Sequence, residues 1–213
     1  MSTRRNGSEV LDRILEAATE IFATEGLAGA RVDEIAARAG VSKALIYYHV
    51  ADKETLYASV MKMLLDRARA ELVEAVAAGT DPEQRLRLAI ATIARLAASP
   101  HFAPLMLREI ASGGAGLPDE LLIEMRKVFG VVAETLAEGT RGGEFREIDP
   151  YATHMLLAGG LLVLMAGTPL RKRVRSVSGD AGEPEALPEY VASLLLDGIR
   201  MPAAAGRRPA RKK

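Results

Sequence analysis

Residues 32–53 read VDEIAARAGVSKALIYYHVADK, and this stretch decides the fold of the chain. Residues 32–39 place apolar side chains at the i, i+3, i+4 and i+7 positions of a short amphipathic helix, which Gly40 would end in a left-handed conformation. Ser42 supplies a side-chain oxygen that can cap a second helix after about three connecting residues. The stretch therefore predicts two short helices joined by a tight turn, which is the spacing of a helix-turn-helix unit.

The outward face of the second predicted helix suits the major groove of DNA. Ala44 and Tyr48 point away from the apolar side of this helix, and Leu45 and Tyr47 lie on its flanks. Lys43 can reach a phosphate or a guanine, small apolar side chains can touch a thymine methyl group, and tyrosine hydroxyls can bond phosphate. Tyr47 also has a second interpretation, packing against the first helix, and one tyrosine can do both.

Lys53 gives an independent indication of an anionic partner. It lies in the first turn of a helix that Asp52 would cap, where a positive charge opposes the helix dipole. An external anion, such as a phosphate group of DNA, would explain a cation at this position.

Residues 11–60 resemble the DNA-binding domain of the tetracycline-repressor (TetR) family of bacterial transcription regulators. The likeness covers an apolar first helix, Gly26, the V-x-x-I-A segment, AGVSK, the I-Y-Y-H-V run and the D-K that follows. The family usually has Phe where Val50 stands, and it favours Ser or Thr where Ala30 and Arg31 stand. Arg31 can replace the usual hydroxyl contact to phosphate with a charge.

The resemblance also bears on two ambiguous residues of the second helix. A lone histidine is usually a packing residue, but His49 lies beside two tyrosines in the family pattern, which favours a phosphate contact. Ala44 is either a small helix former or, as the family's use of this position implies, a point of approach to the bases. The predicted DNA contacts are Arg31, Ser42, Lys43, Ala44, Leu45, Tyr47, Tyr48, His49 and Lys53.

Composition favours an all-α protein with a sizeable core. About half of the 213 residues are apolar, and β-branched residues form no alternating runs. The 28 basic and 28 acidic residues balance, so DNA binding has to rest on the local chemistry of one face. The N-terminus lacks the apolar core of a signal peptide, and the apolar run 155–167 is shorter than the ~20 residues of a membrane helix. We therefore expect a cytoplasmic protein that associates with the nucleoid when bound to DNA.

The sequence contains no residue pattern that indicates a metal site, a catalytic site or a bound cofactor. The chain has no cysteine, and His101 and His154 lack acidic or cysteine companions, so we expect hydrogen-bonded histidines near a cavity and not metal ligands. No Ser/His/Asp or paired-carboxylate arrangement stands out, and the Gly-rich segment 112–116 lacks the Lys-Ser/Thr of a phosphate-binding loop. We predict neither an enzyme nor a cofactor.

Apolar periodicity and Gly/Pro breaks divide the chain into three parts. We assign residues 8–53 to the DNA-binding domain, extending into the connecting helix to about residue 68. The family resemblance implies that residues 54–200 form an effector-binding and dimerisation domain, and we expect 201–213 to be a disordered basic tail. The predicted helices cover residues 8–26, 32–39, 43–49, 53–78, 82–99, from between 100 and 104 to 112, 118–138, 151–166 and 187–200, with a mobile loop at 171–188.

The second domain carries two predicted surfaces. The helix over 151–166 is apolar nearly all round, so it must be buried on two sides, and it pairs naturally with the last helix in an isologous four-helix dimer interface. The residues expected in this interface are Leu156, Gly159, Gly160, Val163, Leu194 and Leu195. The family resemblance implies a mostly apolar effector pocket, for which we name Phe102, Leu105, Met106, Arg108, Met125, Phe129 and Met155. Arg95, His101, Arg108 and Glu109 are candidates for its few polar groups.

These observations predict a ligand-responsive transcription regulator. It would bind a pseudo-palindromic operator as a homodimer and be released by a small hydrophobic or amphipathic effector, and repression is the usual outcome in the family. The alternative is a helical small-molecule-binding protein that has no DNA-binding activity.

Overall fold

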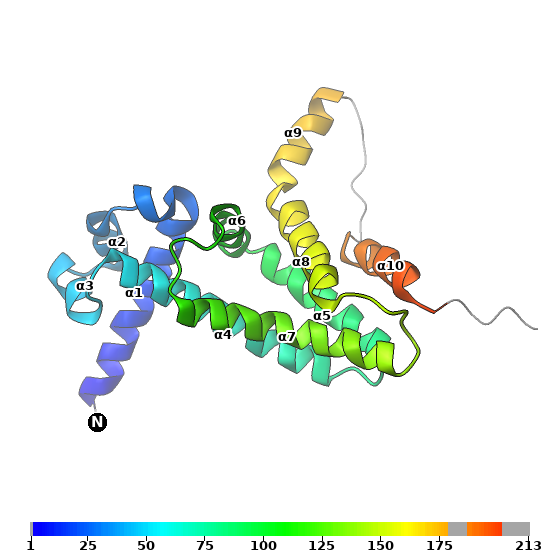
Figure 1. Ribbon diagram of the computed structural model, residues 1–213. Coiled ribbons are helices and arrows are strands. Elements are labelled where there is room, and N and C mark those ends of the chain that lie inside the picture. The colour runs from blue at the N-terminus through cyan, green and yellow to red at the C-terminus, as the bar shows by residue number, and fades with distance from the viewer. Residues whose placement is uncertain (1, 179–186, 202–213) are drawn as a thin grey trace, which may run out of the picture.

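A computed structural model describes residues 2–178 and 187–201, with side chains from Glu9 onward. The described residues form ten helices, together with one isolated antiparallel bridge between Phe145 and Arg200 (Figure 1). The predicted all-α class is therefore confirmed. The tail predicted over 201–213 lies outside the described residues beyond Met201.

Three helices form the N-terminal unit: α1 (Ser2–Gly29), α2 (Val32–Ala39) and α3 (Lys43–His49). α1 begins earlier than the predicted start at residue 8. At Gly26, its predicted end, the backbone leaves helical geometry with φ 71° and ψ 176°, and a last helical turn follows the break.

The turn between α2 and α3 follows the residue pattern. Gly40 ends α2 in a left-handed conformation with φ 66°, and the Ser42 side chain accepts a hydrogen bond from the Leu45 amide at 3.2 Å. Ile35 and Ile46 are fully buried in the same apolar core as Phe22 of α1. The predicted helix-turn-helix arrangement is present at residues 32–49.

A single long helix, α4 (Lys53–Ala77), links the N-terminal unit to the rest of the molecule (Figure 1). Asp52 caps it by accepting a hydrogen bond from the Thr55 amide at 2.7 Å, as predicted. The helix packs against α1 on one side of the molecule and against α5 and α7 on the other. α4 is therefore in contact with both halves of the molecule.

The C-terminal half is a helical bundle with α5 at its centre. Its helices are α5 (Pro82–Ala97), α6 (Phe102–Ser112), α7 (Asp119–Arg141), α8 (Pro150–Ala166) and α10 (Leu187–Ile199). α5 packs against α4, α6, α7, α8 and α10. α6 is bent by 95° from α5 and contacts α1, so it lies at the junction of the two halves.

The prediction of a loop over residues 171–188 is wrong for residues 171–178. Residues Thr168–Ser178 form a helix, α9, which is bent by 60° from α8 and has no buried residue (Figure 1). The glycines and prolines of the predicted loop all lie at or beyond Gly179, whereas residues 170–178 contain neither. Nothing before Gly179 therefore interrupts the helix.

No single helix in the described ranges is long and apolar enough to cross a membrane. Two bent pairs of helices, α5 with α6 and α8 with α9, reach the length and composition of a membrane span. Length and composition are the only criteria that they meet.

Candidate DNA-binding surface and ligand cavity

The nine residues predicted to contact DNA lie on one connected surface around α3. Seven of them run from Ser42 to His49, Arg31 precedes α2, and Lys53 opens α4. The Lys53 ammonium donates to the Ala30 carbonyl at 3.3 Å, which brings Lys53 next to Arg31. The surface therefore combines the start of α2, the whole of α3 and the start of α4.

The aromatic residues of α3 face outward. Tyr48 is 82% exposed and Tyr47 44% exposed, while His49 is half-buried and makes an edge contact with the Tyr48 ring at 5.4 Å. Ser42 uses its oxygen as an acceptor for the α3 cap, so its hydroxyl hydrogen remains able to donate to a phosphate. Tyr47, for which packing against α1 is the alternative, is the less exposed of the two tyrosines, and its exposed part can still reach a phosphate.

The cationic side chains on this surface differ in whether an acidic side chain pairs with them. Lys43 forms an exposed ion pair with Asp33 at 3.1 Å, a contact of the kind that contributes little to stability. Arg31 is exposed and has no ion pair or hydrogen bond from its side chain within the described residues. α3 itself contains no acidic residue. Arg31 is thus the cation most available to a phosphate group.

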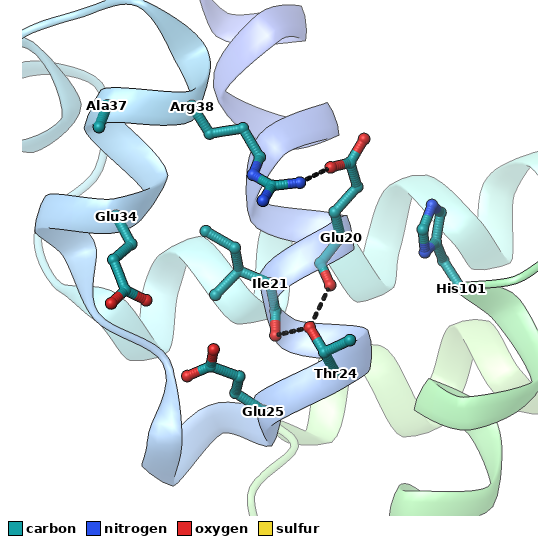
Figure 2. A pocket seen from close by; sticks show the side chains of 8 residues that line it. All are labelled: Glu20, Ile21, Thr24, Glu25, Glu34, Ala37, Arg38 and His101. Carbon is teal, nitrogen blue, oxygen red and sulfur yellow. Dashed lines mark hydrogen bonds and ion pairs between the residues drawn. The ribbon is translucent and has the colours of Figure 1, made fainter.

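A groove of about 530 Å³ is lined by residues of α1 and α2 and by His101 at the start of α6. Figure 2 shows its lining side chains. Its walls hold three glutamates, and Arg38 is engaged by Glu20 in an ion pair. The excess of negative charge disfavours nucleic acid. Among the described residues, no group of three or more potential metal ligands is arranged to hold a metal ion. The lining residues are Glu20, Ile21, Thr24, Glu25, Glu34, Ala37, Arg38 and His101.

A nearly apolar cavity of about 70 Å³ lies inside the C-terminal bundle, between α4, α5, α6, α7 and α8. Five of the seven residues predicted for an effector pocket line it: Phe102, Met106, Met125, Phe129 and Met155. The remaining wall residues are Leu65, Ala68, Leu72, Ile93, Leu96, Ile110, Val128, His154, Ala158, Gly159 and Leu162.

Two residues predicted for the cavity lie elsewhere. Leu105 is fully buried in the core, and Arg108 is exposed and donates a hydrogen bond to the Thr24 carbonyl at 2.9 Å. The other polar candidates are also engaged away from the wall. Arg95 pairs with Glu71 at 2.8 Å, His101 lines the groove of Figure 2, and Glu109 accepts a hydrogen bond from a tyrosine.

His154 is the polar side chain in the cavity wall. It is 2% exposed, and its Nδ1 atom has no hydrogen-bond partner within the described protein. The ring lies against Phe129, with ring centres 4.7 Å apart. Burial lowers the pKa of His154 from 6.5 to about 4, so the imidazole is neutral at physiological pH. His154 lies at a cavity as predicted, but the expectation that it is hydrogen-bonded is wrong for Nδ1, because the wall around it is apolar.

Two polar contacts join α6 to the N-terminal half. The Tyr57 hydroxyl on α4 donates to the buried Glu109 carboxylate, and Arg108 reaches the Thr24 carbonyl of α1. Burial, followed by the hydrogen bond to Glu109, raises the pKa of Tyr57. Since α6 also supplies Met106 to the cavity wall, one helix contacts both the cavity and the DNA-binding half.

The residues predicted for a dimer interface divide into two groups. Leu156, Val163 and Leu194 are exposed apolar side chains, with Leu156 75% exposed, and Gly160 is also exposed. Leu195 is half-buried and borders with Leu156 and Leu194 a groove of about 370 Å³ between α8 and α10. Gly159 instead lines the internal cavity.

Comparison with known proteins identifies the family. The family model for bacterial regulatory proteins of the tetR family matches residues 14–60. The chain is 34% identical over 176 residues to the HTH-type transcriptional repressor SCO4008 of Streptomyces coelicolor. That match covers 80% of this chain and 85% of SCO4008.

Solved structures share the fold. The transcriptional regulator FadR from Bacillus subtilis, solved in complex with stearoyl-CoA, has a TM-score of 0.72 at 22% identity and covers 89% of this chain and 99% of its own. AibR, solved in complex with isovaleryl coenzyme A and operator DNA, has a TM-score of 0.67 at 20% identity and covers 91% of this chain and 100% of its own. Together with the match to SCO4008, these findings show that the chain belongs to the TetR family of DNA-binding transcription regulators, a family without enzymatic activity.

Proposed function

We propose that this regulator is a homodimer that binds a pseudo-palindromic operator through its two α3 helices and leaves it when a small hydrophobic or amphipathic effector enters the cavity of the C-terminal bundle. The observation that carries the DNA-binding part is the exposed, acid-free face of α3 beside Arg31, which is exposed and forms no ion pair within the described ranges. Repression is the expected outcome, since the similar protein SCO4008 is a repressor.

The proposed DNA contacts divide by role. Arg31, Lys43, Lys53 and the hydroxyls of α3 neutralise or bond phosphate, which sets affinity and its dependence on salt. Ala44 and Leu45 approach the bases and set sequence preference through contacts such as that with a thymine methyl group. Residues 8–53, with α4 to about residue 68, act as the DNA-binding domain.

The exposed apolar face of α8 and α10 supports a dimer. Leu156, Val163 and Leu194 would be costly to leave in water, and an isologous contact would bury them in both subunits. Dimerisation would hold the two α3 helices about 34 Å apart or a multiple of that distance, to match successive turns of DNA.

The size of the cavity supports coupling between effector and DNA. About 70 Å³ is well below the roughly 300–1,000 Å³ of a typical ligand pocket, so an effector of ordinary size has to push the walls apart. Those walls include α4 and α6, which both contact α1. Each tenfold loss of operator affinity requires the effector to prefer the displaced state by about 1.4 kcal/mol.

The salt dependence of DNA binding tests the proposal. Full-length protein is titrated onto fluorescent DNA from immediately upstream of its own coding sequence, at several salt concentrations. Arg31→Ala should weaken binding and flatten the slope of log affinity against log salt by about one unit, and Tyr48→Ala should weaken binding. Arg69→Ala, which removes an exposed arginine from α4 outside this surface, is the control and should leave both quantities unchanged.

If Arg31→Ala and Tyr48→Ala change DNA affinity and its salt dependence no more than Arg69→Ala does, α3 and its surroundings do not contact DNA. If no DNA binds at low salt while hydrophobic compounds still stabilise the protein, the molecule is a ligand-binding protein without DNA-binding activity.

A further inference from the structure

The wall of the internal cavity has one polar group and no charge. Its lining consists of aliphatic, aromatic and methionine side chains with one glycine, apart from His154 of α8. His154 is almost completely enclosed, and its Nδ1 atom meets no hydrogen-bonding group of the described protein. A buried polar atom without a partner is destabilising, so its presence in an apolar wall calls for an explanation.

A charged group is poorly suited to this cavity. A carboxylate or ammonium placed inside would lose its hydration and find no opposite charge among the described wall residues. A neutral imidazole, in contrast, offers one donor and one acceptor nitrogen. A hydroxyl group can donate or accept, and a ketone accepts, so either group can pair with a neutral histidine.

We propose that the effector is an uncharged apolar compound with a single hydroxyl or carbonyl group, and that this group hydrogen-bonds to the His154 imidazole when the compound moves the cavity walls apart. The apolar part of the compound contacts Phe129, Met106 and the surrounding aliphatic wall. This inference rests on the proposed function, because it names the chemical class of the effector that enters the same cavity. His154 acts as the residue that selects for a neutral polar group.

The test uses straight-chain compounds of six, eight and ten carbons, each as the 1-alcohol, the 2-ketone, the alkane and the carboxylate. Binding to the full-length protein at pH 7.5 is followed by thermal shift and by the ¹⁵N chemical shifts of the histidine side chains. The chain has three histidines, so the His154 signals can be assigned by substitution. At matched chain length, the alcohol or ketone should bind about tenfold or more tightly than the carboxylate and the alkane. Its binding should shift the His154 side-chain ¹⁵N resonances and leave those of His49 and His101 in place.

Two variants separate recognition from packing. His154→Leu should remain folded, since it removes an unpartnered buried polar atom, and it should lose about tenfold in affinity for the alcohol or ketone while binding the alkane as well as the wild type does. His101→Gln, in the separate groove of Figure 2, should behave as the wild type. If His154→Leu does not fold, the ¹⁵N shift of the wild-type protein decides alone.

Three results would overturn the inference: no binding of any alcohol or ketone, tighter binding of the carboxylate, or unperturbed His154 side-chain ¹⁵N signals with ligand bound. DNA binding by the same protein is measured without these compounds. The ligand class can therefore fail while operator binding stands, and loss of operator binding would count against the regulator itself.

Discussion

His154 links the chemistry of the cavity to the stability of the protein. Burial lowers its pKa to about 4, whereas the unfolded chain has an ordinary imidazole with a pKa near 6.5. Between these two values the unfolded state binds a proton that the folded state excludes. The contribution of the neutral, buried His154 to the free energy of unfolding is therefore complete above about pH 6.5. It is lost as the pH falls toward 4, the pKa of the folded state.

This residue gives a pH prediction. Between pH 7.5 and pH 5, the free energy of unfolding of the wild type should fall by about 2 kcal/mol more than that of His154→Leu, because the unfolded imidazole titrates about 1.5 units above pH 5. Urea denaturation of both proteins at matched pH values measures the difference. Parallel curves for the two proteins would show that His154 is not protected from protonation.

Among the elements, α1 is shaped by one glycine whose conformation other residues avoid. Gly26 has φ 71° and ψ 176°, a region occupied almost only by glycine, and a Cβ there would lie 2.8 Å from Nη1 of Arg108. Gly130 lies in the middle of α7 with helical geometry, and a Cβ there would meet nothing within 4 Å.

The two glycines should respond to alanine in opposite directions. Gly26→Ala should lower the free energy of unfolding by about 1–3 kcal/mol through backbone strain and displacement of Arg108. Gly130→Ala should raise it by about 0.5–1 kcal/mol, since alanine loses less backbone entropy in a helix. Chemical denaturation of both variants checks the signs. Equal effects would mean that the break in α1 imposes no special demand on residue 26.

Most elements could be predicted from local signals. Gly40, Ser42 and Asp52 mark helix ends through their own backbone or side-chain chemistry, and the structure confirms each of them. α9 is not predicted, because its polar, basic sequence resembles that of the Gly/Pro-rich segment that begins at Gly179, although residues 170–178 contain no helix breaker.

The cavity could be predicted only in part. Aromatic and methionine residues identified five of its wall positions, but Leu105 and Arg108 lie on other faces of α6. Leu65 and Ala68 of α4 were missed, because an apolar stripe has the same spacing whether it faces a packed core or an internal cavity. Which face meets the cavity depends on how the helices pack, which spacing alone does not specify.

At the scale of the whole molecule, the exposed apolar face of α8 and α10 is the feature that a single subunit leaves unexplained. Leu156 is 75% exposed in the middle of this face. In an isologous dimer, one glutamate substitution places two carboxylates in the interface, because each subunit contributes the same surface.

Leu156→Glu should therefore convert the dimer to a monomer at micromolar concentration, as measured by analytical ultracentrifugation. Val73→Glu places the same charge at an exposed apolar position of α4, 48% exposed, and should leave the dimer intact. A wild-type protein that sediments as a monomer, or a Leu156→Glu variant that stays dimeric, would exclude this face as the interface.

A compound that fills the cavity should weaken DNA binding. The most direct test is whether the affinity for DNA and the affinity for the compound change each other by the same factor. The Kd for DNA from immediately upstream of the coding sequence is measured with and without a saturating compound that stabilises the protein, and the Kd for that compound with and without saturating DNA. We predict that the compound raises the Kd for DNA at least tenfold and that DNA raises the Kd for the compound by the same factor, because the two sites share one coupling free energy. Tight DNA binding that no bound compound alters, with ligand affinity equally unaffected by DNA, would contradict the coupling of the cavity to α3.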